Sequence, residues 1–266
     1  MLDSNHPGFR DPEYRNRRDQ IAESARAYKY PSPVPWARYT EDENSAWQRI
    51  NTLLSPLHSR NACDLYLRMR DSAALDRNYI PQLDAINIRL ERATGFQLSP
   101  VAGLVNPRSF LSTLAEGRML CTQYIRHHSA PLYTPEPDIV HELLGHVVMF
   151  FDPAYCQLNR EIGEAARVLS DDSLLRLERL YWYSVEFGLV VERGVTRAFG
   201  AGLLSSAGEL GSIEAVPSLP FKFESVVSWP YDTTHMQRTL FRARSIDEMY
   251  AEIRNCIQDL RRRDNV

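Results

Sequence analysis

The sequence predicts a mostly α-helical fold with a small β-sheet element. Residues 40–43 and 245–248 each have the pattern of a helix-capping box, in which a hydroxyl residue is followed three positions later by glutamate. Apolar residues at helical spacing follow both boxes. Strand-like runs are short and lie in the proline-interrupted stretch 215–244. No linker, repeat or low-complexity tract divides the chain, so we expect a single domain over residues 1–266.

The first half of the chain is expected to form an N-terminal arm followed by helices. Residues 1–38 contain a proline cluster and predict the arm, with one short helix near residues 15–28. Thr40 is expected to cap the next helix, and Glu43 to complete the capping box. The buried face of that helix is predicted to hold Trp47, Ile50, Leu53 and Leu54. Further helical stretches are expected near residues 59–71, 81–94 and 107–116.

The second half is expected to contain three helices and a few short strands. Pro137 suits the first position of a helix that would end before Asp152, because Pro153 follows. Ser173 is expected to cap a long helix over residues 174–191. Strands are expected at residues 223–227 and 239–243. The last helix follows the second capping box, and its predicted buried face holds Ile246, Met249, Ile253, Ile257 and Leu260.

The composition argues against several classes of function. The 266 residues are 44% hydrophobic and 24% charged, with a net charge of −3, which is ordinary for a globular protein. That charge gives no reason to expect binding to nucleic acid or to an anionic membrane. We expect neither a membrane-spanning segment nor a signal peptide. The cysteines lack paired spacing, which favours a reduced, cytoplasmic protein; they are Cys63, Cys121, Cys156 and Cys256.

The segment His-Glu-Leu-Leu-Gly-His at residues 141–146 is the strongest chemical signal in the chain. Its two histidines and Glu186 offer two imidazoles and one carboxylate. This is the ligand set that holds non-heme iron(II) on one face and leaves the opposite face open for dioxygen and substrate. The pattern therefore indicates an oxygenase.

The histidine spacing distinguishes this segment from a zinc protease motif. A zinc protease helix has His-Glu-x-x-His, with its histidines at i and i+4 on one face. Here His141 and His146 are at i and i+5, so about 140° would separate them on an ideal α-helix, at roughly 100° per residue. A π-type turn would align them, and Gly145 makes such a distortion easier. On spacing alone, there is an alternative to a shared metal site: the two histidines are unrelated, one buried and one on the surface.

Longer blocks of the sequence resemble a known family. Residues 121–127 (Cys-Thr-Gln-Tyr-Ile-Arg-His) and 132–146, which end with the histidine pair, closely resemble the pterin-dependent aromatic amino acid hydroxylases. This family contains the phenylalanine, tyrosine and tryptophan hydroxylases. The resemblance runs in family order from about residue 6 to at least residue 210, and it is weaker in the tail. Further matching blocks are residues 6–9, 80–83, 94–96, 100–104, 185–189 and 200–206.

The resemblance implies a single, mostly helical catalytic domain of the aromatic amino acid hydroxylase type. It covers that domain alone, so we expect neither the N-terminal regulatory domain nor the C-terminal tetramerisation helix of the animal enzymes. We therefore expect a monomer or a dimer whose partner is a small amino acid substrate.

The resemblance also implies roles for individual residues. His141, His146 and Glu186 match the iron ligands. Ser205 matches a serine that orients the first histidine, and Glu142 matches a glutamate that contacts the pterin through water. Positions that match substrate-binding residues are Arg126, Thr134, Pro137, Trp182, Phe187 and Ser205. Positions that match pterin-binding residues are Leu104, Val105, Phe110, Glu142 and Tyr181.

The function implied by the resemblance is ring hydroxylation of a free aromatic amino acid, with iron(II), tetrahydrobiopterin or a related tetrahydropterin, and O2 as co-substrate. Phenylalanine is the first choice, because Trp182 is typical of the phenylalanine and tyrosine branches. Tyrosine or tryptophan hydroxylation is an alternative. So is meta-hydroxylation of phenylalanine for secondary metabolism, since Leu120 and Ala207 depart from the family pattern. A zinc hydrolase and a non-catalytic amino acid sensor are the alternatives from other classes.

Overall fold

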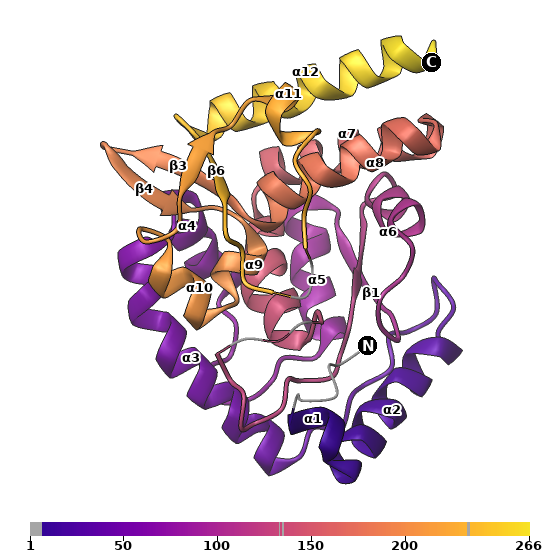
Figure 1. Cartoon of the computed structure of the whole chain (residues 1–266). Coiled ribbons are helices and arrows are strands. Elements are labelled where there is room, and N and C mark those ends of the chain that lie inside the picture. Colours follow the sequence, from indigo (N-terminus) through magenta and orange to yellow (C-terminus); the bar gives the residue numbers. More distant parts are fainter. Residues whose placement is uncertain (1–6, 133, 135, 233–234) are drawn as a thin grey trace.

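The fold is mostly helical, as predicted. The computed structural model describes residues 7–132, 134, 136–232 and 235–266. Helix α12 (Ile246–Asp264) crosses one end of the molecule, α3 (Glu41–Asn61) runs along one side, and α2 (Pro12–Ala27) covers the opposite end (Figure 1). The other α-helices in these ranges are α1 (Pro7–Arg10), α4 (Asp64–Ala73), α5 (Leu83–Thr94), α6 (Pro107–Leu114), α7 (Pro153–Val168), α8 (Asp171–Tyr181), α9 (Ala201–Leu204), α10 (Ala207–Ser212) and α11 (Phe223–Val226).

Three short turns of other helical types interrupt this framework. Two are π-helical, η1 (His141–Val147) and η3 (Trp182–Glu186), and one is a 3₁₀ turn, η2 (Met149–Phe151). Turns of the π type are rare overall, and those that occur are often found at functional sites. Here they carry all three residues that the sequence offers as metal ligands.

The strands of the described chain form two small sheets. Strand β1 (Gln97–Pro100) pairs in parallel with β2 (Arg118–Cys121). The second sheet has the order β4-β3-β6-β5, and its strands are β4 (Val195–Ala198), β3 (Gly188–Glu192), β6 (Leu240–Ala243) and β5 (Ser218–Pro220). Strand β3 pairs antiparallel with β4 and parallel with β6. Because β3 follows η3 almost directly, this sheet fixes one end of the turn that carries Glu186.

Several predicted helices are confirmed. Thr40 and Glu43 form the predicted capping box at the start of α3. Three of the four residues predicted for its buried face are buried, but Leu53 is 37% exposed and lies outside that face. On α12, Met249, Ile253, Ile257 and Leu260 are buried as predicted, and Ile246 packs partly buried against the core. The stretches expected near 81–94 and 107–116 are α5 and α6, and the one near 59–71 begins later, as α4.

One predicted helix start is wrong by two residues, and one predicted capping box is incomplete although its helix starts where expected. Helical backbone begins at Ile139, two positions after Pro137, because the Asp138 carboxylate accepts the His141 backbone N–H at 3.0 Å and so caps the turn. The second capping box is incomplete. Ser245 caps α12, but the Glu248 carboxylate accepts from the Arg244 backbone N–H instead of returning to Ser245.

The long helix predicted over residues 174–191 is corrected to three elements. Ser170, not Ser173, caps α8, and Ser173 is buried and donates to Asp264. The α-helix ends at Tyr181, the π-turn η3 follows, and residues 188–192 form β3. The Leu-Val-Val run is better placed in a buried strand than on a helix, because β-branched residues pack well on a pleated surface.

Two further expectations are corrected. Residues 223–227 were expected as a strand but contain the helical turn α11. The helix α7 was not predicted, although Asp152 and Pro153 begin it with an N-cap and a first-turn proline. The strand expected at 239–243 is confirmed as β6.

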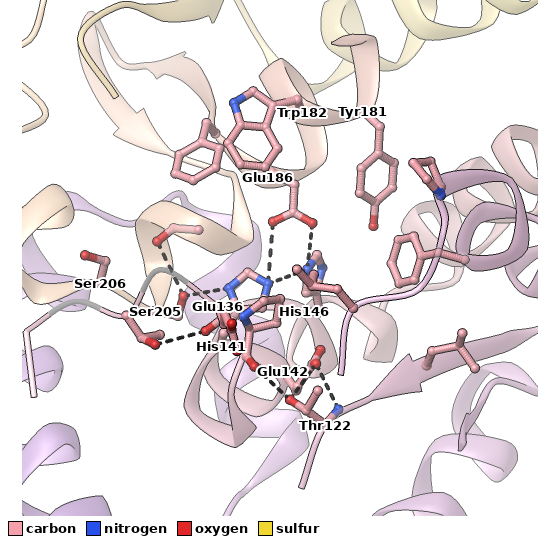
Figure 2. A pocket seen from close by; sticks show the side chains of 18 of the residues that line it. Thr122, Glu136, His141, Glu142, His146, Tyr181, Trp182, Glu186, Ser205 and Ser206 are labelled. Atoms are coloured by element: carbon pink, nitrogen blue, oxygen red, sulfur yellow. Dashed lines mark hydrogen bonds and ion pairs between the residues drawn. The ribbon is translucent and has the colours of Figure 1, made fainter. Parts of the chain in front are cut away.

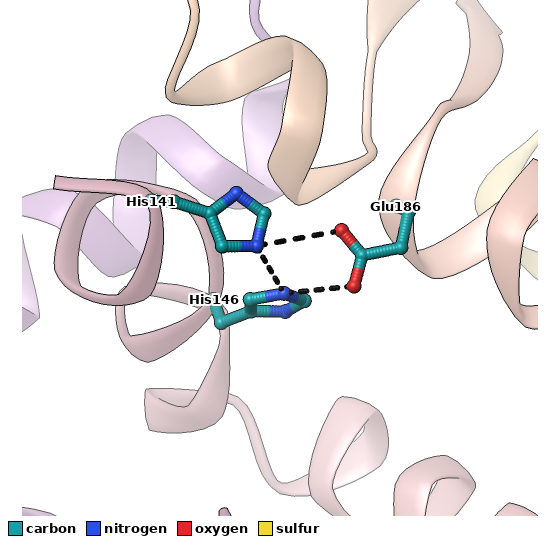
Figure 3. Close-up of side chains that lie close together, drawn as sticks. All are labelled: His141, His146 and Glu186. Atoms are coloured by element: carbon teal, nitrogen blue, oxygen red, sulfur yellow. Dashed lines mark hydrogen bonds and ion pairs between the residues drawn. The ribbon is translucent and has the colours of Figure 1, made fainter. Parts of the chain in front are cut away.

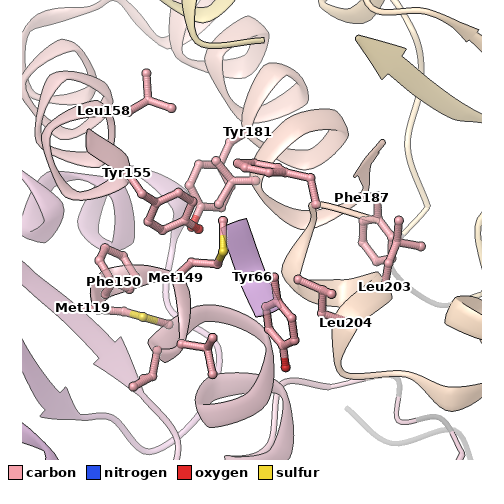
Figure 4. Close-up of a cluster of buried hydrophobic side chains, with 14 of the residues drawn as sticks. Tyr66, Met119, Met149, Phe150, Tyr155, Leu158, Tyr181, Phe187, Leu203 and Leu204 are labelled. Carbon is pink, nitrogen blue, oxygen red and sulfur yellow. The ribbon is translucent and has the colours of Figure 1, made fainter. Parts of the chain in front are cut away.

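The core is one large cluster of buried side chains that reaches the histidine-bearing turn. Figure 4 shows Tyr66, Met149, Phe150, Tyr155 and Tyr181 packed together within it. All four cysteines are buried, and none forms a disulfide. None of the helices in the described ranges is both long and apolar enough to cross a lipid bilayer.

Helices α6 and α7 approach each other closely at Gly163. A Cβ atom at this position would lie 2.3 Å from the Ala115 backbone nitrogen and 2.8 Å from the Leu111 carbonyl oxygen. Backbone atoms cannot move aside as a flexible side chain can, so a side chain here would force the two helices apart.

We expect Gly163→Ala to lower the free energy of unfolding by about 1–3 kcal/mol, the usual cost of overpacking. The matched control is Gly211→Ala in α10, where the nearest atom to the new Cβ is 3.9 Å away. That variant should be neutral or more stable by about 0.5–1 kcal/mol. Urea unfolding measures both, and equal shifts for the two variants would contradict this description of the α6–α7 contact.

Candidate active site

The three predicted metal ligands converge on one point. Their ligand atoms lie within 4.8 Å of one another (Figure 3). The Nε2 atoms of His141 and His146 are 3.1 Å apart. Glu186 places one carboxylate oxygen 3.0 Å from His146 Nε2 and the other 3.6 Å from His141 Nε2. Residues 45 positions apart in the chain therefore meet as the sequence predicted.

The π-helical form of η1 brings the histidine pair together. Its wider turn puts residues at i and i+5 on one face, which an α-helix would separate. Two neighbours hold the turn in this form. Tyr66 donates its hydroxyl to the Leu144 carbonyl at 2.8 Å. At Gly145, an added Cβ would lie 2.7 Å from the Ala201 carbonyl oxygen, so α9 packs directly on the turn.

Ser205 fixes the tautomer of His141. Its hydroxyl donates to the Ala201 carbonyl at 2.8 Å. The only hydrogen of Oγ is then used, so Oγ accepts the hydrogen bond that it shares with His141 Nδ1 at 3.1 Å. The proton of His141 therefore lies on Nδ1, and the Nε2 lone pair points toward Glu186. This geometry fits the orienting role that the resemblance implies for Ser205.

The charges around the histidines suit a cation. Burial lowers the pKa of His141 to about 4, against the opposing charge of Glu186, so this imidazole is neutral at neutral pH. Burial would also lower the pKa of His146, but the charge and hydrogen bond of Glu186 outweigh it and raise that pKa. Two ring nitrogens that face each other and one carboxylate leave lone pairs directed at a common centre. Such a donor set fits iron(II), and one side of it opens into a pocket.

The pocket has a volume of about 300 Å³ and is lined by the metal triad together with every substrate and pterin position named from the sequence. These positions are Leu104, Val105, Phe110, Arg126, Thr134, Pro137, Glu142, Tyr181, Trp182, Phe187 and Ser205. Figure 2 shows Tyr181 and Trp182 beside Glu186, and Thr122 and Glu142 on the far side of the histidines. The fold thus brings together residues from distant segments, and their individual roles stay predictions.

Arg126 is a buried cation at the wall of this pocket. Its Nε and Nη2 atoms donate to the two oxygens of Asp138 at 2.9 and 2.7 Å, and Nη1 donates to the Ser205 carbonyl at 3.1 Å. The bidentate pair fixes the plane of the guanidinium. Thr134, also on the wall, donates its hydroxyl to the Glu136 carbonyl at 3.0 Å. The buried arginine gives the pocket a preorganised site for an anionic group.

Asp138 was missed by the sequence reasoning, although it joins two parts of the site. One carboxylate holds Arg126 and also caps the turn that begins with His141. The sequence signal was available, because an acidic residue one turn before a histidine is a common helix cap. Its bidentate contact with an arginine twelve residues earlier could not be read from local spacing.

Aromatic side chains form two parts of the pocket wall. Trp182 stacks between Phe187 and Tyr231, with ring centroids 4.6 and 4.9 Å away. Phe110 meets Tyr181 edge to face at 5.8 Å. Leu104 and Val105 lie at the mouth and are 72% and 37% exposed. An open mouth with apolar side chains and an edge-to-face pair behind it suits a flat heteroaromatic ring.

Glu142 is held deep in the pocket wall. Its Oε1 atom accepts from the backbone N–H and from the hydroxyl of Thr122, both at 3.0 Å. Burial raises its pKa to about 7, against the opposing charge of His146. Two hydrogen bonds to one oxygen leave the second oxygen available for water or ligand.

Three pocket residues from the C-terminal part, Glu209, Tyr231 and Gln237, were also missed as site residues. Trp182 Nε1 donates to Gln237 Oε1 at 3.1 Å, and the Gln237 backbone N–H donates to Glu209 Oε1 at 3.0 Å. The second oxygen of Glu209 is buried without a hydrogen-bond partner among the described residues. Tyr231 donates to Glu178 at 3.4 Å. No short motif marks these residues, because they come from separate elements.

Comparison with known proteins gives a consistent result. A family model described as biopterin-dependent aromatic amino acid hydroxylase matches residues 1–266. Tyrosine 3-monooxygenase of Schistosoma mansoni is 42% identical over 262 residues, which cover 96% of this chain and 56% of the relative. Phenylalanine-4-hydroxylase of Homo sapiens is 41% identical over 260 residues, which cover 96% of this chain and 58% of the relative. The chain thus spans little more than half the length of these curated relatives.

Solved structures resemble the chain over most of its length. The phenylalanine hydroxylase of Chromobacterium violaceum, in a crystal structure with bound iron(III) and the oxidized cofactor 7,8-dihydrobiopterin, is 26% identical, with a TM-score of 0.81. The match covers 91% of this chain and 92% of that chain. The apo phenylalanine hydroxylase of Colwellia psychrerythraea has a TM-score of 0.78 at 26% identity, over 88% of this chain and 94% of that chain.

The buried carboxyl of Glu209 should make stability depend on pH. Burial raises its pKa from 4.5 to about 7. A raised pKa means that the folded state disfavours the charged form, so the stability present below about pH 4.5 is lost as the pH rises through about 7. The variant Glu209→Gln keeps an oxygen for the Gln237 N–H but cannot ionise. We expect its free energy of unfolding, relative to that of wild type, to rise by on the order of 2–3 kcal/mol as the pH goes from about 5 to about 8. Urea unfolding at both pH values measures this, and a pH-independent difference would contradict it.

Proposed function

Because this chain belongs to the biopterin-dependent aromatic amino acid hydroxylases, we propose that it is an iron(II)- and tetrahydropterin-dependent monooxygenase that hydroxylates the ring of a free aromatic amino acid. The single observation that carries the proposal is the convergence of His141, His146 and Glu186 at the inner end of the pocket. Two neutral donors and one carboxylate leave coordination positions open on the pocket side. Bound iron(II) would supply dioxygen activation there, with electrons from the pterin.

The chain's own residues hold the reactants at that centre. Ser205 keeps His141 in the tautomer that a metal requires. Arg126, fixed by Asp138, binds the carboxylate of the amino acid, and Thr134 lies beside it on the pocket wall. When the carboxylate of the substrate is held in this way, its ring lies against the apolar wall next to the metal.

The two aromatic regions divide the pocket between substrate and cofactor. Trp182 and Phe187, with Pro137, form the wall for the substrate ring. Phe110 and Tyr181, with Leu104 and Val105 at the mouth, receive the pterin ring. Glu142 would contact the pterin through a bridging water. Its two hydrogen bonds to Thr122 hold it in place for this contact.

We propose phenylalanine as the first-choice substrate. The curated relatives include tyrosine and phenylalanine hydroxylases at 42% and 41% identity, so similarity alone does not separate these substrates. The only polar atom of the Trp182 indole is already bonded to Gln237, and Phe187 offers none. The wall formed by Trp182 and Phe187 therefore offers no unpaired polar group that would need a ring hydroxyl. Tyrosine, tryptophan and meta-hydroxylation of phenylalanine are the alternatives; Leu120 lines the pocket, and Ala207 lies partly buried near it.

A zinc hydrolase is the alternative from another class. Its general base would have to be Glu142, but that carboxylate is held by Thr122 on the far side of the histidines from Glu186. Aromatic surfaces that suit a pterin have no use in such an enzyme. Metal analysis of the purified protein separates the two proposals, since one requires iron for activity and the other zinc.

The decisive experiment supplies iron(II), tetrahydrobiopterin and O2 with each of the three aromatic amino acids, and identifies products by chromatography and mass spectrometry. We expect tyrosine from phenylalanine, in amounts that require both iron and pterin. Glu186→Ala should abolish product, because it removes the only charged ligand of the triad. Oxygen consumption without any ring-hydroxylated product, from any of the three amino acids, would contradict the proposed function.

Gln237 should set the position of the Trp182 indole and with it substrate affinity. Gln237→Met keeps the length of the side chain but removes the acceptor for Trp182 Nε1 and the donor to the Asp232 and His235 carbonyls. We expect it to raise KM for phenylalanine about 3- to 10-fold, at least the worth of one hydrogen bond. The value of kcat should change much less, because the indole does not touch the metal ligands. The variant Gln237→Glu keeps an acceptor for Trp182 Nε1, but it places a carboxylate oxygen against the Asp232 and His235 carbonyls that Nε2 now contacts at 3.1 and 3.2 Å, so it should restore KM only in part.

The matched control is Gln82→Met. Gln82 also makes two hydrogen bonds through its amide, to the backbone of Ala37, but it does not line the pocket. Loss of the Gln82 amide should change the free energy of unfolding without changing KM for phenylalanine. Steady-state kinetics on all three variants test the idea, and a KM in Gln237→Met equal to that of Gln82→Met would refute it.

A further inference from the structure

A second cavity of about 290 Å³ lies behind the histidine-bearing turn, between α3 and α4. It shares no lining residue with the pocket described above. Leu144 and Val148 contribute to its wall, so it borders the turn that carries the two histidines. Its other chemically distinctive residues are His58, Tyr66, Arg70 and Arg77. Nothing in the proposed reaction uses this space.

Arg70 has donors inside this region that no group of the described chain satisfies. Its Nε and Nη1 atoms are buried and make no hydrogen bond. The nearest carboxylate oxygen, from Asp71, is 3.7 Å from Nε, which is beyond hydrogen-bond distance. The Asp71 side chain is 79% exposed, so water weakens this ion pair. Buried charged donors without acceptors are costly, and they indicate a missing partner.

The electrostatic surroundings of the cavity are positive. Burial, together with the charges of Arg70 and Arg77, lowers the pKa of His58 to about 4, against the opposing effect of its hydrogen bond to Leu204. The same Arg70 charge acts on the buried hydroxyl of Tyr66. Two guanidinium groups thus face a neutral imidazole and a neutral phenol, and the one acidic neighbour, Asp71, points mainly to solvent.

The end of α4 does not account for Arg70. A cation in the last turn of a helix often serves the unpaired carbonyl groups there. In this chain Arg89 of α5 has that role, because it donates to the carbonyls of Ser72 and Ala74 at 2.9 and 3.5 Å. The guanidinium of Arg70 therefore does not serve the carbonyls at the end of α4, and it can donate to another acceptor.

We propose that this cavity binds a small oxyanion, a phosphate or a carboxylate, through the guanidinium of Arg70, with Arg77 adding charge at the exposed side. A guanidinium presents parallel N–H donors that match the oxygens of either group. The bound anion would satisfy the buried donors and neutralise the positive cavity. This inference does not rest on the proposed function, because it concerns a separate space.

The cavity is linked to the metal centre by two hydrogen bonds. Tyr66 donates to the Leu144 carbonyl, which lies between the two histidines in the chain, at 2.8 Å. His58 Nε2 donates to the carbonyl of Leu204, next to Ser205, at 2.7 Å. The rings of His58 and Tyr66 are 4.8 Å apart. An anion bound by Arg70 beside this pair would stabilise the support of the metal turn, so its effect would appear as added stability of the folded protein.

The test measures thermal unfolding and isothermal titration of the iron-loaded protein with inorganic phosphate and, separately, with acetate, against chloride at matched ionic strength. We expect one of the two oxyanions to raise Tm with a saturable dependence on its concentration, as ligand linkage requires. Saturation by phosphate identifies a phosphate site, and saturation by acetate identifies a carboxylate site. If neither does better than chloride, the proposal is overturned.

Three variants test whether the anion binds at this cavity or at the iron. Arg70→Met should weaken the anion about ten- to a hundredfold, the worth of a charge-assisted hydrogen bond. Arg77→Met, at an exposed position that tolerates change, should weaken it less but measurably. The control Arg68→Met changes an exposed arginine of the same helix that does not line the cavity. Equal anion affinity in wild type, Arg70→Met and Arg77→Met would refute the site.

Discussion

The active site depends on one conformational constraint, the π-helical turn that brings His141 and His146 to the same face. An α-helix over the same residues would direct the two imidazoles apart, whereas here their Nε2 atoms are 3.1 Å from each other. A turn of this kind is less favourable than α-helix and persists only where its surroundings hold it. The Asp138 carboxylate accepts the backbone N–H of His141, the first residue of the turn. The Tyr66 hydroxyl donates to the Leu144 carbonyl, and α9 packs on Gly145.

The second π-turn delivers Glu186 by a similar device. Its end is fixed by close backbone contacts, since a Cβ at Gly200 would lie 2.3 Å from the Glu186 carbonyl oxygen and one at Gly188 would lie 2.4 Å from the Ser184 carbonyl oxygen. Strand β3 begins immediately afterwards and is paired on both sides. The carboxylate is thus held by a sheet and the imidazoles by helices. Two independent supports meeting at one point make a rigid site on which a substrate can be positioned.

The sequence predicted the features that depend on local chemistry and missed those that depend on tertiary contacts. Residue types suggested the metal triad and the family resemblance supported it, while the mismatch between five residues and the helical repeat predicted the π-turn. The resemblance named pocket positions that all line one cavity. The helix expected through residue 191 failed because the Leu-Val-Val run is taken by a buried sheet, which helix periodicity does not reveal. Asp138, Glu209 and Gln237 were missed because their partners lie in other segments.

The most direct test of the central claim is a crystal structure of the iron(II)-loaded protein with anomalous diffraction measured at the iron edge. The convergence of the three side chains predicts a single iron bound by Nε2 of His141, Nε2 of His146 and the carboxylate of Glu186, with its open positions toward the pocket. An iron bound elsewhere, or the loss of any of these three ligands from its coordination, would contradict the account.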